Sequence, residues 1–318
     1  MRVLVTGGRG TVGRGLIEEL ERRGAEVFSV DLHHSAEQAG FSLLNTEPRV
    51  SYARCDVAEF RQLERVFDLF GPFDFVYHAA AEFGRWNGED YYEQLWRTNA
   101  IGTKNVIRLQ ERLGFRLIHF SSSEVYGDWP ELMVEAVMEH HEVKQLNDYA
   151  MTKWVNEMQI RNSRELFGTE SVIVRLFNTY GPGEYYSVYR SVNCRFLYCA
   201  LHGIPWTVHR GHARTSSFLP DTVRTLANIT ENFRAGETYN VGGGHLHTIE
   251  ELSDIVLTVT GSNPALVHIA EPERLTTTRK LVDTSKAVKD LGHGNTATLE
   301  EGMAATAEWM RGVYGIAR

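Results

Sequence analysis

The chain has 318 residues, of which 42% are hydrophobic and 23% charged, and it contains 28 glycines. These proportions are typical of a globular protein of one or two domains and exclude a low-complexity chain. A net charge of −8 gives no basic field for nucleic acid. No apolar run approaches the ~20 residues that a membrane helix needs, so we expect no membrane contact. The three cysteines, an odd number, and a first segment typical of a buried strand rather than a signal peptide favour the cytoplasm.

The first half of the chain alternates short apolar runs with helical patterns, which is typical of βαβ units and a parallel sheet. Strands are expected at residues 2–6, 26–31, 50–55, 73–78, 115–121 and 170–177, and helices at 13–23, 61–70, 91–113 and 147–167. Beyond Pro182 the regular alternation of strands and helices gives way to an aromatic-rich segment and shorter elements. We expect a first domain over residues 1–180, to which a segment at about 215–245 returns, and a smaller lobe over 181–318.

A glycine-rich turn separates the first expected strand from the first expected helix. Gly7, Gly10 and Gly13 form a G-x-x-G-x-x-G pattern, with Thr11 and Val12 between the last two. Side chains at these glycines would collide with a pyrophosphate, and the following helix N-terminus offers free N–H groups to it. The alternative is a tight strand–helix turn without a ligand. The position of the turn favours an α/β fold of the Rossmann type, a doubly wound parallel sheet that binds a dinucleotide.

Asp31 ends the second expected strand, 18 residues after Gly13. A carboxylate at this place bonds the ribose hydroxyls of the adenosine half and repels an additional 2′-phosphate. Arg9 and the pair His33–His34 are cations or potential cations that would tolerate such a phosphate, and a plain strand-end cap is the alternative for Asp31. The sequence therefore predicts NAD rather than NADP as the cofactor.

Tyr149 and Lys153 are four residues apart, so they lie on the same face of the expected helix at 147–167. A free phenol titrates near 10. We expect the lysine charge and a bound nicotinamide to lower the pKa of Tyr149, so that it acts as a base. Ser122 follows the fifth expected strand, where its hydroxyl would share the substrate hydroxyl with Tyr149. These three residues predict a hydride-transfer site.

The chain resembles the extended short-chain dehydrogenase/reductases, in particular the NAD-dependent nucleotide-sugar epimerases, dehydratases and decarboxylases. The resemblance runs along nearly the whole chain. It rests on the glycine turn, Asp56–Val57, His78–Ala81, Asn99 with Gly102–Thr103, Ser121–Gly127, Tyr149 with Lys153, and Arg175–Pro182. The segment 82–92 departs from the usual pattern, and we expect it to shape the sugar pocket.

The resemblance implies positions for both ligands. Asp56 and Val57 would hold the adenine, whereas Ala79, Ala80, Ala81 and Asn99 would lie on the cofactor side together with Tyr149 and Lys153. A nucleotide-diphosphate sugar would be the substrate. Asn178, Arg214 and Arg279 would contact it, and Arg190 is a candidate reader of a carboxylate.

Ser123 and Glu124 fall on the pair that separates the subfamilies. In this family the shared first step oxidises the sugar C4 hydroxyl. The resemblance implies Asp-Glu at this pair for 4,6-dehydratases, Ser-Glu for decarboxylases of UDP-glucuronate, and usually no such carboxylate for 4-epimerases. Ser122, Ser123, Glu124, Tyr149 and Lys153 therefore predict decarboxylation or dehydration of the 4-keto sugar. A 4-epimerase with a structural Glu124, and a catalytically silent dinucleotide-binding regulator, are the alternatives.

The sequence also bears on metals and on assembly. Thirteen histidines are present, but none has cysteine or carboxylate partners at ligand spacing, so no metal is expected. The resemblance implies a homodimer through the helices at 91–113 and 147–167. Their apolar residues would pack between subunits or belong to the core of one chain: Ile101, Val106, Ile107, Met151, Trp154, Val155 and Met158.

Overall fold

The computed structural model describes residues 1–32 and 51–316, so His33, His34 and Val50 lie outside the described residues. Its centre is a parallel sheet whose seven described strands follow the order β11-β6-β5-β4-β1-β2-β3. The strands are β1 (Arg2–Thr6), β2 (Glu26–Asp31), β3 (Tyr52–Arg54), β4 (Phe75–His78), β5 (Arg116–Ser122), β6 (Ser171–Leu176) and β11 (Thr238–Val241). The chain order reverses between β1 and β4, the place where α/β sheets open a ligand crevice at the carboxyl ends of their strands.

Helices cover both faces of the sheet. One face packs against α1 (Thr11–Arg22), α9 (Leu219–Asn228) and α11 (Ser285–Leu291). The other packs against α2 (Phe60–Phe70), α5 (Gly102–Leu113) and α7 (Asp148–Phe167). The strands carry apolar side chains on both faces because both are covered. The predicted doubly wound Rossmann-type fold is confirmed.

The segment expected to form one helix at 91–113 is interrupted. It consists of α4 (Tyr92–Trp96), a π-helical turn (Arg97–Ile101) and α5, and it is preceded by the short helix α3 (Arg85–Asp90). The wider turn carries Asn99, whose side chain is buried. The Asn99 amide accepts a hydrogen bond of 2.8 Å from the N–H of Glu82 and donates one of 3.1 Å to the Glu82 carbonyl. The π-helical turn thereby fixes the backbone of Glu82, where the segment 82–92 begins.

The candidate dimer face divides into buried and exposed residues. Val106 and Ile107 are fully buried in the core between α5 and the sheet, so for these two residues the structure shows the second alternative, the core of one chain. Ile101, at the end of the π-helical turn before α5, remains 54% exposed, and Met151 and Met158 on α7 each remain 41% exposed.

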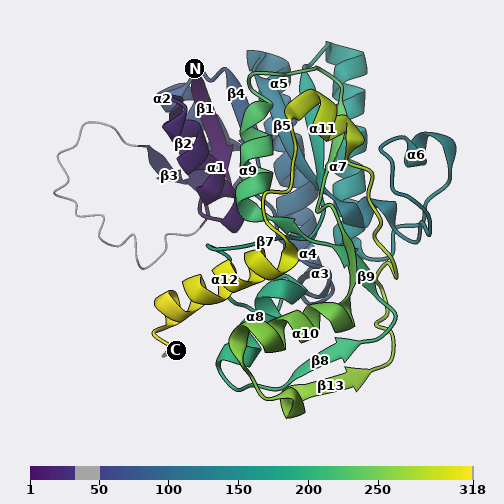
Figure 1. Cartoon of the computed structure of the whole chain (residues 1–318). Coiled ribbons are helices and arrows are strands. Elements are labelled where there is room, and N and C mark those ends of the chain that lie inside the picture. The colour runs from purple at the N-terminus through teal and green to yellow at the C-terminus, as the bar shows by residue number, and fades with distance from the viewer. Residues whose placement is uncertain (33–50, 317–318) are drawn as a thin grey trace.

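Most of the remaining elements gather below the sheet, whereas a short helix, α6 (Val137–His140), lies beside α7 (Figure 1). Their core joins α8 (Val192–Leu201), α10 (Ile249–Thr260), α12 (Leu299–Tyr314) and β8 (Trp206–His209). The other short elements are η3 (Ser123–Tyr126), β7 (Thr179–Tyr180), β9 (Ala213–Thr215), β10 (Ser217–Phe218), β12 (Leu246–Thr248), η4 (Pro264–Leu266) and β13 (Val267–Ala270). Among the described helices, none has the length and apolar character to cross a bilayer.

Candidate active site

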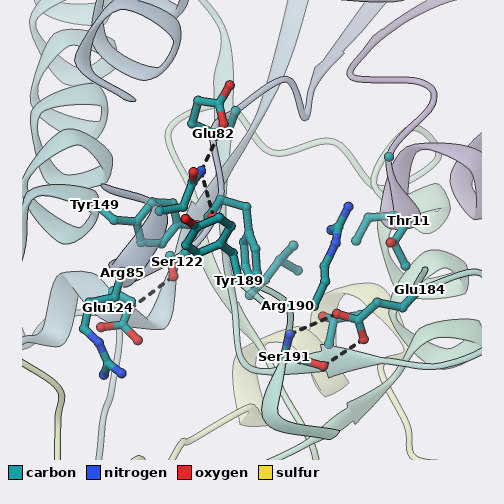
Figure 2. A pocket seen from close by; sticks show the side chains of 18 of the residues that line it. Thr11, Glu82, Arg85, Ser122, Glu124, Tyr149, Glu184, Tyr189, Arg190 and Ser191 are labelled. Atoms are coloured by element: carbon teal, nitrogen blue, oxygen red, sulfur yellow. Dashed lines mark hydrogen bonds between the residues drawn. The ribbon is translucent and has the colours of Figure 1, made fainter. Parts of the chain in front are cut away.

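A cavity of about 790 Å³ lies between the sheet and the lower elements. The carboxyl ends of β1, β2, β4 and β5 form one wall, and the segments 184–196, 207–214 and 273–280 form the other. Figure 2 shows Tyr149, Ser122 and Glu124 together on one side, with Arg85 beside Glu124, and Glu184, Ser191 and Arg190 across from them. The cavity therefore has a cofactor end at the glycine turn and a second end at Glu124.

The glycine turn is a cradle that side chains would fill. Gly7 has a φ of +71°, and a Cβ there would lie 2.6 Å from the backbone nitrogen of Ala80. A Cβ on Gly13 would collide with the carbonyl oxygen of Gly7, so β1 and α1 approach closely only with glycine at both positions. No described side chain caps α1, and no acidic residue occupies its first turn. Gly10, Thr11 and Val12 line the cavity at the start of α1, where the positive end of the helix dipole fits a pyrophosphate.

Asp31 lines the cavity at the end of β2, where a ribose-binding carboxylate is expected. Its side chain accepts a hydrogen bond of 2.9 Å from the backbone N–H of Arg9. The Arg9 guanidinium lies 4.0 Å from the ring centroid of Tyr52. The other predicted cofactor residues in the wall are Gly7, Gly10, Gly13, Asp56, Val57, Ala79, Ala80 and Ala81. This set fits an adenine dinucleotide.

Tyr149, Lys153 and Ser122 meet at the start of α7 and the end of β5. The side chain of Asn147 caps α7 by accepting from the N–H of Ala150 at 2.8 Å. The Lys153 ammonium donates to the carbonyl of Phe120 at 2.8 Å and lies 5.8 Å from the Tyr149 ring centroid. The structure therefore brings the three predicted catalytic residues together.

The pKa values of this pair follow from burial. Burial lowers the pKa of Lys153 to about 8. Burial also raises the pKa of Tyr149, although a hydrogen bond to Ser122 offsets part of that effect. The groups of the chain thus raise the pKa of Tyr149, and the lowered value expected at the site depends on the nicotinamide as well. The charge of Glu124 adds to the effect of desolvation, because both disfavour the phenolate.

Glu124 forms a buried ion pair with Lys280 at the end of the cavity away from the glycine turn. Lys280 also donates to the Ser123 hydroxyl at 3.2 Å, and Asn147 donates to Glu124 at 3.3 Å. Burial by itself would raise the pKa of Glu124, but the charges of Lys280, Arg214 and Arg85 lower it to about 2. Glu124 is therefore a carboxylate throughout the physiological pH range.

Two further cations border this ion pair. Arg214 is buried, and its guanidinium donates to the carbonyl of Thr278 and the hydroxyl of Thr276, both at 3.1 Å. Arg85 pairs with Glu273 at 2.6 Å. Within this cluster three cations face two carboxylates, so one positive charge is left for an anionic group of a ligand.

Two predicted residues lie outside the cavity wall. Arg279 is exposed, because the bridge between Ala213 and Arg279 turns its side chain outward and the next one, Lys280, inward. Asn99 is buried behind the wall, where it bonds Glu82 and Thr152. These placements correct the expectation that Arg279 and Asn99 face a ligand.

Asn178 and Arg190 do line the cavity. Asn178 has a φ of 37°, a left-handed conformation that asparagine tolerates, at the turn between β6 and β7. Arg190 is half-buried, and its guanidinium lies 6.0 Å from the ring centroid of Phe83.

The residue patterns did not single out Lys280 or Glu184, and they included Glu82 only as part of the segment 82–92. All three residues line the cavity. Glu184 accepts from the backbone N–H and the hydroxyl of Ser191, at 3.2 and 2.8 Å, and burial raises its pKa. For Lys280 a signal was available, since it directly follows the predicted Arg279, and only the strand register decides between the two. No group of histidine, cysteine, aspartate and glutamate among residues 1–32 and 51–316 has the arrangement of a metal site.

The fold and this site fit a nicotinamide-dependent enzyme. The model of the NAD dependent epimerase/dehydratase family matches residues 3–242, and the chain belongs to that family, whose cofactor is NAD. The chain is 30% identical over 326 residues to UDP-glucuronic acid decarboxylase 6 of Arabidopsis thaliana, covering 99% of this chain and 90% of the relative. It is 25% identical over 340 residues to dTDP-glucose 4,6-dehydratase of Salmonella typhimurium, covering 97% and 92%. The solved structure of Thermus thermophilus UDP-glucose 4-epimerase with NAD superposes with a TM-score of 0.87 at 26% identity, covering 98% of this chain and 99% of that one.

Proposed function

We propose that the protein oxidises the C4 hydroxyl of a nucleotide-linked hexuronate and then removes the C6 carboxylate as carbon dioxide. The observation that carries this proposal is the cluster around Glu124, where Lys280, Arg214 and Arg85 supply one positive charge more than Glu124 and Glu273 neutralise. A uronate carboxylate at this end would complete the charge balance. Arginine suits carboxylate and diphosphate oxygens because its fork bonds two oxygens at once.

The first step requires a base at the C4 hydroxyl. Tyr149 accepts the proton, and Ser122, which hydrogen-bonds Tyr149, orients the hydroxyl between them. Lys153 contributes its charge beneath Tyr149, held there by the carbonyl of Phe120. The glycine turn and Asp31 would hold NAD, and the bound cofactor would accept the hydride from C4.

The second step distinguishes the possible reactions. Dehydration begins with removal of the C5 proton, and a carboxylate with a pKa of about 2, as Glu124 has, is a weak base for that purpose. A 4-keto uronate is a β-keto acid, which loses carbon dioxide without a base. The Ser123 hydroxyl receives a hydrogen bond from Lys280 and offers no carboxylic acid to expel a C6 hydroxyl. The site therefore favours decarboxylation over dehydration.

The test is mass spectrometry of products after incubation with NAD and separate nucleotide sugars, including UDP-glucuronate, UDP-glucose and dTDP-glucose. Loss of carbon dioxide from the uronate supports the proposal. Loss of water from a glucose nucleotide would replace it with a 4,6-dehydratase, and an inverted centre at unchanged mass would replace it with a 4-epimerase.

We propose further that two copies associate through α5 and α7 in the cytoplasm. The exposed Ile101, Met151 and Met158 support the first part, because apolar side chains on adjacent helices are typical of a helical interface. The unpaired, buried thiols of Cys55 and Cys194 are consistent with a reducing compartment. Light scattering of wild type and Ile101→Asp measures the assembly, and an unchanged mass would contradict this interface.

A further inference from the structure

Lys280 reaches the cavity on a segment that crosses from the lower elements to the end of β5. Its backbone N–H donates to the carbonyl of Ala213 at 3.0 Å, and the N–H of Met133 donates to the carbonyl of Leu281 at 2.8 Å. The hydroxyl of Thr277 bonds the carbonyl of Gly127. The segment is thus anchored on both sides of Lys280, whose side chain is only 3% exposed.

The Lys280 ammonium lies next to the residues assigned to the C4 chemistry. It contacts the carboxylate of Glu124 and the hydroxyl of Ser123. The N–H of Glu124 in turn donates to the Ser122 hydroxyl at 3.2 Å. A sugar whose C4 hydroxyl lies between Ser122 and Tyr149 has one of the two ring carbons next to C4 beside these side chains, and this carbon is C5 when the C6 carboxylate binds the cations of the cluster.

After carbon dioxide is lost, a proton must be added to C5. The C5–C6 bond breaks, its electron pair forms the enolate of C4 and C5, and a proton must then reach C5 as the C4 carbonyl re-forms. Glu124 is ionised and holds no proton to give, and Tyr149 serves the C4 oxygen. We propose that the Lys280 ammonium donates the proton to C5, an inference that rests on the proposed function. The resulting neutral amine regains a proton from water before the next turnover.

Two physical features support a donor at this position. Burial lowers the pKa of Lys280, Glu124 raises it, and Arg214 and Arg85 lower it, with a net lowering. An ammonium with a lowered pKa transfers its proton more readily. Glu124 also fixes the ammonium in one direction, so the proton should arrive on one face of C5.

The experiment is a single turnover of UDP-glucuronate in deuterium oxide, with carbon dioxide release and pentose formation followed separately. For wild type we expect one solvent deuteron at C5, in a single orientation. Lys280→Arg keeps the positive charge beside Glu124 but does not release its proton, because the pKa of arginine exceeds about 12. We expect this variant to release carbon dioxide at close to the wild-type rate, with pentose formation slower by about a hundredfold or more. Its deuterium should be distributed over both orientations.

Lys286→Arg is the matched control, since Lys286 pairs with Glu237 and does not line the cavity. It should behave as wild type, and NAD binding should be equal in all three proteins if they are folded. Pentose formation by Lys280→Arg at the wild-type rate, with deuterium in one orientation, would overturn the role of Lys280. Absence of carbon dioxide from the wild type would overturn the proposed function itself, and the role of Lys280 with it.

Discussion

The two ends of the cavity are built in different ways. The cofactor end is made from short contiguous stretches, above all the glycine turn at 7–13 and the ends of β2 and β4. The opposite end collects Arg85, Glu124, Arg214 and Lys280 from four segments that are far apart in the chain. Local geometry determines the first end, whereas long-range pairing determines the second. The cofactor site can thus be identified from local sequence, whereas the end of the cavity that we assign to the substrate depends on tertiary structure.

Tyr149→Phe should give the largest effect, because Tyr149 lies at the junction of the two ends. The substitution keeps the buried ring and removes only the hydroxyl that bonds Ser122. We expect turnover to fall by about 10²–10⁴-fold, the usual contribution of a general base. NAD binding, measured by calorimetry, should stay at the wild-type value. Turnover within a few-fold of wild type would remove Tyr149 from the chemistry.

Glu124→Gln should separate the two reaction steps. The neutral amide leaves Lys280 without its carboxylate partner, so the ammonium binds the substrate carboxylate instead and stabilises it against loss. Oxidation at C4 should persist and carbon dioxide release should fall, so the absorbance of reduced cofactor rises on the enzyme. If carbon dioxide release is unchanged and no such absorbance develops, Glu124 has only a structural role.

The contrast between local geometry and long-range pairing also separates what the sequence predicts from what it does not. Apolar periodicity is local, so the order of strands and helices and the glycine turn follow from it. The π-helical turn at Arg97–Ile101 does not, because a single wider turn is too short to show a period of its own in the apolar pattern. Asn99 belongs to that turn, which explains why it bonds Glu82 instead of facing the cavity.

Arg279 and Lys280 illustrate the second limit. Both are cations in one short segment, and nothing within that segment says which of them faces inward. The pairing of Ala213 with Arg279 decides it, and this contact joins residues that are far apart in the sequence. Arg85 and Glu273 likewise meet only in the folded chain.

A pair of arginine variants would sharpen this distinction. Arg214→Met removes a buried guanidinium at the second end, and Arg279→Met removes an exposed one nearby. Hydrogen bonds to charged groups contribute about 1.5–3 kcal/mol, so we expect KM for the nucleotide sugar to rise about 10- to 100-fold for Arg214→Met. KM for Arg279→Met should match the wild type. Equal effects of the two variants would show that burial does not separate them in function.

The smallest effect should come from the cofactor end. Asp31→Asn removes the negative charge that repels a 2′-phosphate and leaves the rest of the wall in place. The Arg9 guanidinium, stacked on Tyr52 at 4.0 Å, is close enough to the end of β2 to attract that phosphate once the carboxylate is gone. We expect the preference for NAD over NADP, measured as the ratio of the two Kd values, to fall by about tenfold, since one charged contact contributes about 1.4 kcal/mol. An unchanged ratio would mean that the backbone around Gly7 and Gly10, and not the charge of Asp31, selects the cofactor.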